Sequence, residues 1–369
     1  MTIAGRVRDT MTSADLTGPS TRSSLARIVL KGNSYERGLQ YGRQFGPCLE
    51  RFYRWFVRRD PEELLTGAYL DALERMEGMA AEHFPQLLEQ LKGWSDGAKL
   101  SHDTCRIMAF HNEISNVLRP GCSNILVTQG GEGPWLARNC DLSEAERSWQ
   151  VQMISHCDDC HSSASIGYLG LPHGIGVNQA GLAIGGSSLP AERRVSLKGM
   201  PTMAAALLST QGSVAECVGR IEALGHLGKG VNLALLDASG EGAVLALGGG
   251  ETHAYRPGEQ GFLVATNHSI DGKTKCPAGV SPAYLESSRA RYARLTRILS
   301  AARQAERTPD LGRKALADMQ GKWSVCEHVP GGFHTIYAWV IQPGRDRTRM
   351  DLCWGYPCQN AFEPVDLDW

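Results

Sequence analysis

The sequence has almost no net charge, and it has no long apolar run. The formal net charge is −1 over 369 residues, so no excess of positive charge is available to attract nucleic acid or an anionic membrane. No apolar stretch reaches the roughly 20 residues that a transmembrane helix needs. Residues 1–25 are rich in Thr, Ser, Asp and Arg and lack the apolar core of a signal peptide, so they are expected to form a disordered leader. We therefore expect a cytoplasmic protein without a nucleic-acid or membrane partner.

Compact cysteine spacing is also missing, although the chain contains 11 cysteines. An odd number of scattered cysteines in a chain of this size argues against a disulfide scaffold. Most are expected to be buried thiols in a reducing compartment. The sequence has no internal repeat, and its glycine-rich segment 225–230 lacks the spacing of a phosphate-binding loop. No nucleotide cofactor is therefore indicated.

The spacing of apolar residues changes at residue 121. Between Ser34 and Leu118, apolar residues recur at helical spacing. After Cys122, alternating apolar and polar residues predict strands, with further helices between them. The predicted hairpins span 231–247 and 335–354, and the predicted later helices span 203–224 and 284–303. This order of elements predicts one α+β domain over residues 26–369, in which sheet packs on sheet and helices lie outside.

The most informative point is the dipeptide Gly121-Cys122, which follows Pro120. Gly121 has no Cβ to hinder attack on its carbonyl, and Pro120 stiffens the backbone before it. If the Gly121–Cys122 bond broke, Cys122 would begin a new chain with its α-amine beside its own sulfur. A free α-amine has a pKa of about 7.7–8.0 and a thiol of about 8.5, so the amine could accept the thiol proton near neutral pH. The pattern predicts a self-contained thiolate nucleophile.

Two charged residues follow at the end of the next predicted strand, in the segment Leu136-Ala137-Arg138-Asn139-Cys140-Asp141. Asp141 could orient the new amine, and Arg138 could neutralise a carboxylate or hold a substrate. An ordinary surface ion pair is the alternative interpretation.

Gly121-Cys122 followed by Arg138-Asn139-x-Asp141 resembles the isopenicillin N acyltransferase family of self-cleaving N-terminal-nucleophile enzymes, whose relatives include choloylglycine and penicillin V hydrolases. Five further segments resemble family motifs in the expected order: Tyr35–Gly42, Gly176–Leu182, Ala265–His268, Ser287–Arg289 and Gly355–Cys358. The resemblance implies a four-layer αββα sandwich of the N-terminal nucleophile hydrolase type. It also implies an inactive precursor that cuts itself into a helical segment, 26–121, and a catalytic segment, 122–369, which remain together as a heterodimer.

The resemblance implies roles for single residues. Cys122 would be the nucleophile and, through its amine, the base. Asp141 and Arg138 would organise that N-terminus. Asn178 and Asn267 would line the oxyanion pocket, where a side-chain amide donor lowers the barrier by roughly 3–4 kcal/mol. A turn-forming role is the alternative for either asparagine.

Further residues are expected around the reacting centre. Arg289 would hold Cys122 and would also hold charge at the reacting centre. The alternative is that Arg289 belongs to a solvated helix face, because it lies in a run of arginines. His173, His268 and Ser288 are expected to bind substrate.

The expected reaction moves an acyl group from a small-molecule amide or thioester to an amine through a Cys122 acyl-enzyme, in secondary metabolism. Water as the acceptor would make the protein an amidase, and the sequence leaves the acceptor open. No cofactor or metal is expected, although acyl-coenzyme A could be the donor. Ser123-Asn124, Cys140 and Leu142 depart from the family pattern near the substrate, which indicates an unusual substrate.

The run His156–His161 matches no motif of the family. Cys157-x-x-Cys160-His161 formally matches the haem attachment pattern, and its cysteines and histidines could bind zinc. No export signal and no second Cys-x-x-Cys pair supports either site. A zinc- or haem-binding redox protein is therefore the alternative from another class, and a polar hairpin loop is the simplest interpretation.

Overall fold

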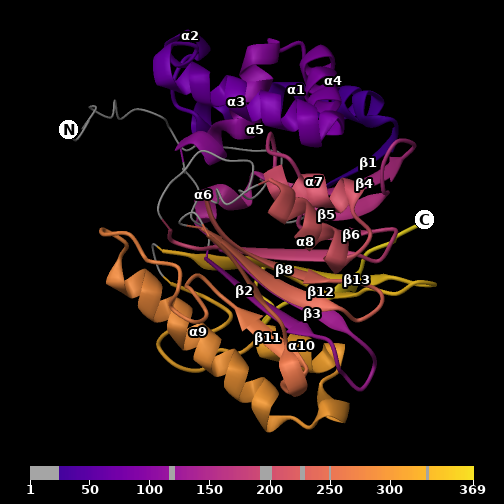
Figure 1. Cartoon of the computed structure of the whole chain (residues 1–369), viewed down its shortest axis with the longest axis vertical. Coiled ribbons are helices and arrows are strands. Elements are labelled where there is room, and N and C mark those ends of the chain that lie inside the picture. Colours follow the sequence, from indigo (N-terminus) through magenta and orange to yellow (C-terminus); the bar gives the residue numbers. More distant parts are fainter. Residues whose placement is uncertain (1–24, 116–120, 192–201, 225–228, 249–250, 330–331) are drawn as a thin grey trace.

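The computed structural model describes residues 25–115, 121–191, 202–224, 229–248, 251–329 and 332–369. Two β-sheets lie face to face in the middle of the molecule, and helices cover the outer face of each sheet (Figure 1). Hydrogen bonds join the sheets directly, for example from Arg138 Nε to the Gly186 carbonyl at 2.9 Å. The expected α+β fold with four αββα layers is confirmed. The expected leader lies outside the described residues except for Leu25.

The helices before residue 116 form one outer layer, as the apolar spacing predicts. They are α1 (Ser34–Phe56), α2 (Pro61–Leu64), α3 (Gly67–His83), α4 (Pro85–Ala98) and α5 (His102–Ser115). A capping box begins α1, because Asn33 Oδ1 accepts from the Glu36 N–H while the Glu36 carboxylate accepts from the Asn33 N–H. A Cβ on Gly38 of α1 would lie 2.2 Å from the Gln90 carbonyl oxygen of α4. Glycine therefore lets α1 and α4 pack with their backbones in contact.

The sheet beneath these helices has eight strands. Their order is β1 (Ala26–Gly32), β4 (Gln150–Cys157), β5 (Ser163–Tyr168), β6 (Gly176–Asn178), β7 (Ala183–Ser188), β8 (Lys229–Leu236), β9 (Gly242–Gly248) and β10 (Glu251–Tyr255). The segment 26–121 is thus not wholly helical, because β1 pairs in parallel with β4. The part of the chain before Cys122 is therefore joined to the later part by a row of backbone hydrogen bonds.

The second sheet has six strands and carries the expected site. Their order is β11 (Phe262–Ala265), β2 (Gly121–Val127), β3 (Trp135–Leu142), β12 (His334–Gln342), β13 (Arg349–Trp354) and β14 (Glu363–Pro364). The helices α9 (Pro282–Ala301) and α10 (Pro309–Leu316) cover its outer face (Figure 1). The expected hairpins are β8–β9 and β12–β13. Both are confirmed.

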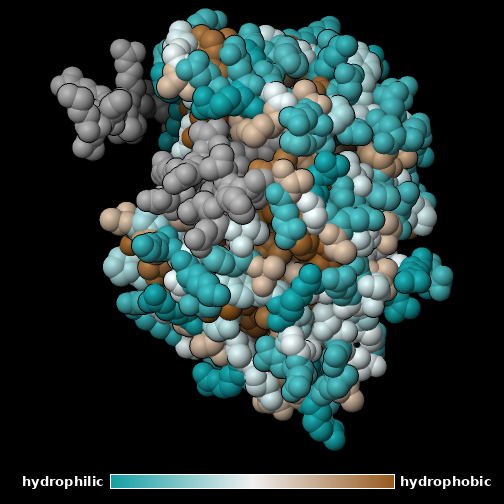
Figure 2. All heavy atoms as spheres, viewed as in Figure 1, coloured by the Kyte–Doolittle hydropathy of each residue, from teal (hydrophilic) through white to brown (hydrophobic). Residues whose placement is uncertain are grey.

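The remaining helices are short. They are α6 (Glu144–Arg147), α7 (Thr202–Thr210) and α8 (Val214–Ala223), with single 3₁₀ turns at Gly258–Gln260 and Gln304–Glu306. Across the face in Figure 2, hydrophilic residues predominate, and apolar residues gather beside the atoms drawn in grey. Among the described helices, none combines the length and the apolar character needed to cross a membrane.

Candidate active site

Cys122 is the second residue of β2, and it is completely buried. Every residue of β2 is buried, because one face of the strand meets the other sheet and the opposite face meets α9. In the β2–β3 pairing Cys122 lies opposite Cys140, and Gly121 lies opposite Asp141. The tertiary pairing therefore brings together the two segments that the sequence singled out.

The Arg138 guanidinium lies beside the Cys122 sulfur. Its Nη2 is 3.0 Å from the Cys122 Sγ and 3.4 Å from the Cys140 Sγ. Nη1 donates to the Tyr337 hydroxyl at 3.0 Å. Together with the bond from Nε to the opposite sheet, these contacts fix a buried cation next to the thiols. A cation in this position favours a thiolate.

Cys122 and Cys140 form a coupled pair of thiols. Burial, together with the hydrogen bond to Cys140, raises the pKa of Cys122 well above its ordinary value. Burial alone would also raise the pKa of Cys140, but the hydrogen bond from Cys122 and the charge of Arg138 lower it to about 6. The charge of Arg138 therefore favours a thiolate on Cys140, while the Cys122 thiol stays protonated to higher pH.

Asp141 is completely buried behind residue 121. Its Oδ1 accepts from the Thr335 hydroxyl at 2.6 Å. Its Oδ2 is 3.8 Å from Arg291 Nη1 and has no hydrogen-bond donor among the described residues. A Cβ on Gly121 would lie 3.5 Å from this Oδ2. Burial, with the nearby Glu327 carboxylate, raises the pKa of Asp141 to about 7. Within the described part of the chain, one oxygen of Asp141 thus lies close to Gly121 without a donor.

Asn267 holds the backbone of Cys122 from the loop that follows β11. Its Oδ1 accepts from the Cys122 N–H at 2.9 Å, and its Nδ2 donates to the Ser188 carbonyl at 3.0 Å. Its own N–H donates to Ser288 Oγ at 2.7 Å, and the same hydroxyl is 2.7 Å from His268 Nδ1. Burial, assisted by the charges of nearby arginines, lowers the pKa of His268 to about 4, so its ring is neutral at physiological pH. Ser288 and His268 therefore support the Asn267 loop.

Arg291, and not Arg289, contacts the expected nucleophile. Arg289 is exposed, whereas Arg291 is 1% exposed. Arg291 Nη1 donates to the Cys122 carbonyl at 2.7 Å, and Nη2 donates to Asn267 Oδ1 at 3.0 Å. Its Nε lies 3.1 Å from Glu327 Oε1. Arg289 and Arg291 lie on opposite sides of α9, because two residues turn an α-helix by about 200°. The spacing of Arg291, Leu295 and Leu299 was the sequence signal for the buried face.

Asn178 lies away from this group and has a local role. Its Nδ2 donates to the carbonyls of Leu208 and Gln211, each at 2.8 Å, and its Oδ1 accepts from the Leu182 N–H at 3.0 Å. These bonds join the β6–β7 turn to the end of α7. The structure therefore favours the turn-forming alternative for Asn178 over the oxyanion role.

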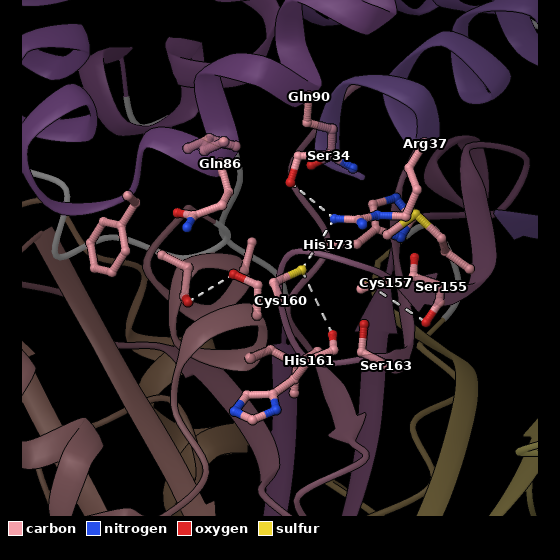
Figure 3. Close-up of a pocket in the computed structure, with 17 residues that line it drawn as sticks. Ser34, Arg37, Gln86, Gln90, Ser155, Cys157, Cys160, His161, Ser163 and His173 are labelled. Atoms are coloured by element: carbon pink, nitrogen blue, oxygen red, sulfur yellow. Dashed lines mark hydrogen bonds between the residues drawn. The ribbon is translucent and has the colours of Figure 1, made fainter. Parts of the chain in front are cut away.

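His173 lines a separate small cavity of about 50 Å³, drawn in Figure 3. Burial lowers the pKa of His173 to about 4. Cys157 and Cys160 line the same cavity from the β4–β5 hairpin, and Arg37 Nη2 is 3.2 Å from the Cys160 sulfur. The His161 ring points away from both sulfurs (Figure 3). The expected hairpin loop is confirmed, and the structure does not bring His173 to Cys122.

A larger cavity of about 420 Å³ is lined in part by Arg291. Tyr284, Trp323, Val329 and Phe333 line its apolar part, and Arg291 and Glu327 supply its charges. Sequence reasoning did not find these residues or Thr335 and Tyr337, since they come from segments far apart in the chain. The cavity offers space for an apolar group beside Arg291.

Comparison with known proteins gave one matching family and several similar structures. A family model described as acyl-coenzyme A:6-aminopenicillanic acid acyl-transferase matches residues 128–359. The match includes Arg138, Asp141, Asn267 and Arg291, and it begins after Cys122. A search of curated protein sequences gave no match.

Several solved structures have a similar fold. The Caenorhabditis elegans ortholog of N-acylethanolamine-hydrolyzing acid amidase is 12% identical over 62% of this chain and 98% of its own, with a TM-score of 0.45. Penicillin V acylase from Agrobacterium tumefaciens is 14% identical over 63% of this chain and 83% of its own, with a TM-score of 0.40. A mutant conjugated bile acid hydrolase from Clostridium perfringens is 10% identical over 66% of this chain and 96% of its own, with a TM-score of 0.42.

The family match, unlike these distant structural similarities, spans more than half of the chain. It runs from the residue after β2 to the turn after β13 and so includes strands of both sheets. The protein therefore belongs to the family of acyl-coenzyme A:6-aminopenicillanic acid acyl-transferases.

Proposed function

We propose that the protein cuts its own chain between Gly121 and Cys122, and that the new N-terminal Cys122 then transfers an acyl group from an amide or thioester to an amine. The observation that carries this proposal is the buried Asp141 Oδ2. Among the residues that the structure describes it has no hydrogen-bond donor, and it lies close to Gly121. An α-ammonium released at Cys122 could donate to this oxygen, and a buried polar atom without a hydrogen-bond partner is costly.

The cut would begin when the Cys122 sulfur attacks the carbonyl carbon of Gly121. A carbon–sulfur bond forms, the carbon–nitrogen bond breaks, and the thiol proton goes to the leaving nitrogen. Water then hydrolyses the thioester, which leaves a carboxylate at Gly121 and a free thiol at Cys122. Asn267 and Arg291 hold the nitrogen and the carbonyl oxygen of Cys122, so the residue would keep its orientation after the cut.

In the cut enzyme the amine of Cys122 would take the proton of its own thiol, and Arg138 would stabilise the resulting thiolate. The thiolate attacks the donor carbonyl, the donor amine or thiol leaves, and an acyl-enzyme remains. An amine acceptor or water then attacks the same acyl-enzyme. Transfer and amide hydrolysis are thus two outcomes of one mechanism, and a place in secondary metabolism stays a prediction from the family resemblance.

The acyl group has a candidate pocket in the larger cavity beside Arg291. Tyr284, Trp323 and Phe333 give it an aromatic wall, and apolar pockets with few charges are typical of small-molecule sites. We propose that an apolar or aromatic acyl group occupies it, next to Arg291.

Intact-mass measurement and N-terminal sequencing test the cut. Wild-type protein should give chains of 121 and 248 residues (369 − 121), the longer one starting at Cys122. Cys122→Ala should stay as one chain, whereas Cys353→Ala, which removes another buried thiol of the same sheet, should cut like wild type. Cutting in Cys122→Ala, or an uncut wild type that turns over an acyl-anilide probe, would refute the mechanism. A trapped acyl adduct on Cys122, with and without an added amine, then separates transfer from hydrolysis.

A further inference from the structure

Three side chains of types that ligate metals meet near Glu327, which lies between two of them in the sequence. They are Cys326 and His328, in the loop before β12, and Cys358, in the turn after β13. Among the described residues, this is the group whose ligand atoms all lie within 4.8 Å of one another. The run His156–His161 forms no such group there.

The distances between these ligand atoms fit a tetrahedral zinc ion. Cys326 Sγ is 3.5 Å from Cys358 Sγ, and His328 Nε2 is 3.4 Å from the first sulfur and 3.2 Å from the second. Zinc bonds of about 2.3 Å to sulfur and about 2.0–2.1 Å to nitrogen place such atoms about 3.8 Å (S–S) and about 3.6 Å (S–N) apart. Each ligand would therefore shift by only a few tenths of an ångström. A disulfide needs the two sulfurs much closer, at about 2.05 Å.

The surrounding structure fixes the ligands before any ion binds. The Tyr356 ring stacks on His328 with centroids 3.7 Å apart and an interplanar angle of 17°. The N–H groups of Gln359 and Asn360 donate to the Tyr356 carbonyl and form the turn that carries Cys358. The Cys326 N–H donates to the Asp318 carbonyl at 3.0 Å. A site whose ligands are oriented in this way loses little conformational entropy on binding.

We propose that Cys326, His328 and Cys358 bind one Zn²⁺ ion, with water as the fourth ligand. Binding would release the two thiol protons, and the two thiolates would balance the charge of the ion. Cys326 is buried, whereas His328 and Cys358 are half-buried, so the ion can enter from the surface. Two thiolates and an imidazole are ligands that Zn²⁺ prefers over Mg²⁺ or Ca²⁺.

The ion would connect two segments next to the candidate active site. Glu327 lies between two of its ligands in the chain and pairs with Arg291. The Glu327 N–H donates to Thr335 Oγ1, and the Thr335 hydroxyl donates to Asp141. The zinc site would therefore stabilise the loop that holds both Arg291 and Asp141. Its existence does not depend on the proposed cut at Cys122.

The test is metal analysis of the full-length protein, purified reduced and without chelators or a metal-affinity step. Wild type should carry roughly one zinc per chain, as a single site of this type does. Cys326→Ser and Cys358→Ser should each lose the ion. Cys276→Ser, at an exposed cysteine outside the group, and Cys157→Ser, in the other cysteine–histidine run, should keep it.

A second measurement covers variants that do not fold. Wild-type protein stripped with a chelator is titrated with Co²⁺, and we expect a sulfur-to-cobalt charge-transfer band that saturates at one equivalent and disappears on addition of Zn²⁺. The proposal is wrong if neither zinc nor this band is found. It is also wrong if Cys358→Ser keeps its zinc, or if peptide mapping shows a Cys326–Cys358 disulfide in the purified protein.

Discussion

Arg291 and Arg289 offer a matched pair of substitutions on one helix. Arg291 is 1% exposed and contacts Cys122, Asn267 and Glu327, whereas Arg289 is exposed. Replacing Arg291 by glutamine would leave the carboxylates of Glu327 and Asp141 buried without their cation. Breaking a buried ion pair in this way costs about 3–5 kcal/mol, whereas a surface substitution stays within about 0.5 kcal/mol. Arg291→Gln should therefore lose a large share of the free energy of unfolding, and Arg289→Gln almost none.

The measurement is urea unfolding at pH 8, made in the Cys122→Ala background so that every variant is one uncut chain. Arg291 contacts residue 122 through the backbone carbonyl, so this background keeps the contact. The midpoint of Arg291→Gln should fall with an unchanged denaturant slope. In cutting-competent protein the same substitution should slow the appearance of the 248-residue chain, whereas Arg289→Gln should cut at the wild-type rate. Equal midpoints for the two variants would show that the buried arginine has no special role.

Three further predictions follow. Because the pKa of Asp141 is raised to about 7 from an ordinary value of 3.8, the folded uncut chain binds a proton that the unfolded chain releases between these pH values; its stability should fall by roughly 4 kcal/mol from pH 4 to pH 8, at about 1.4 kcal/mol per unit. In Asp141→Asn that part of the slope should vanish, and an identical pH profile would contradict the assignment. Asn267→Ala, which frees the Cys122 N–H, should slow cutting roughly tenfold or more. Asn178→Ala should lower the free energy of unfolding in urea by about 2 kcal/mol and should cut normally once folded. The reverse result would restore the oxyanion role to Asn178. Gly38→Ala should destabilise the α1–α4 contact by more than about 2 kcal/mol, whereas Gly78→Ala, with open space around it in α3, should stabilise the protein by up to about 1 kcal/mol; equal melting temperatures would argue against the close backbone packing.

Local patterns were enough to predict the layers and the principal residues of the candidate site. The helical spacing before residue 116 and the alternation after Cys122 each reflect one apolar face, which packing needs whatever the partner is. The β8–β9 and β12–β13 hairpins depend on turns only a few residues long, so their positions could also be read directly. β1 was missed because a parallel strand is specified by a distant partner, here β4, and not by a local turn.

The tertiary structure alone decided which buried polar groups meet. The β2–β3 register places Arg138 and Cys140 beside the Cys122 sulfur and places Asp141 opposite Gly121. The phase of α9 places Arg291 at the Cys122 carbonyl and leaves Arg289 in solvent. Cys326, His328 and Cys358 come together only where two loops meet at the sheet edge. Sequence spacing shows which side of an element is buried, but contacts between elements depend on register and packing angle, which arise only when the whole core assembles.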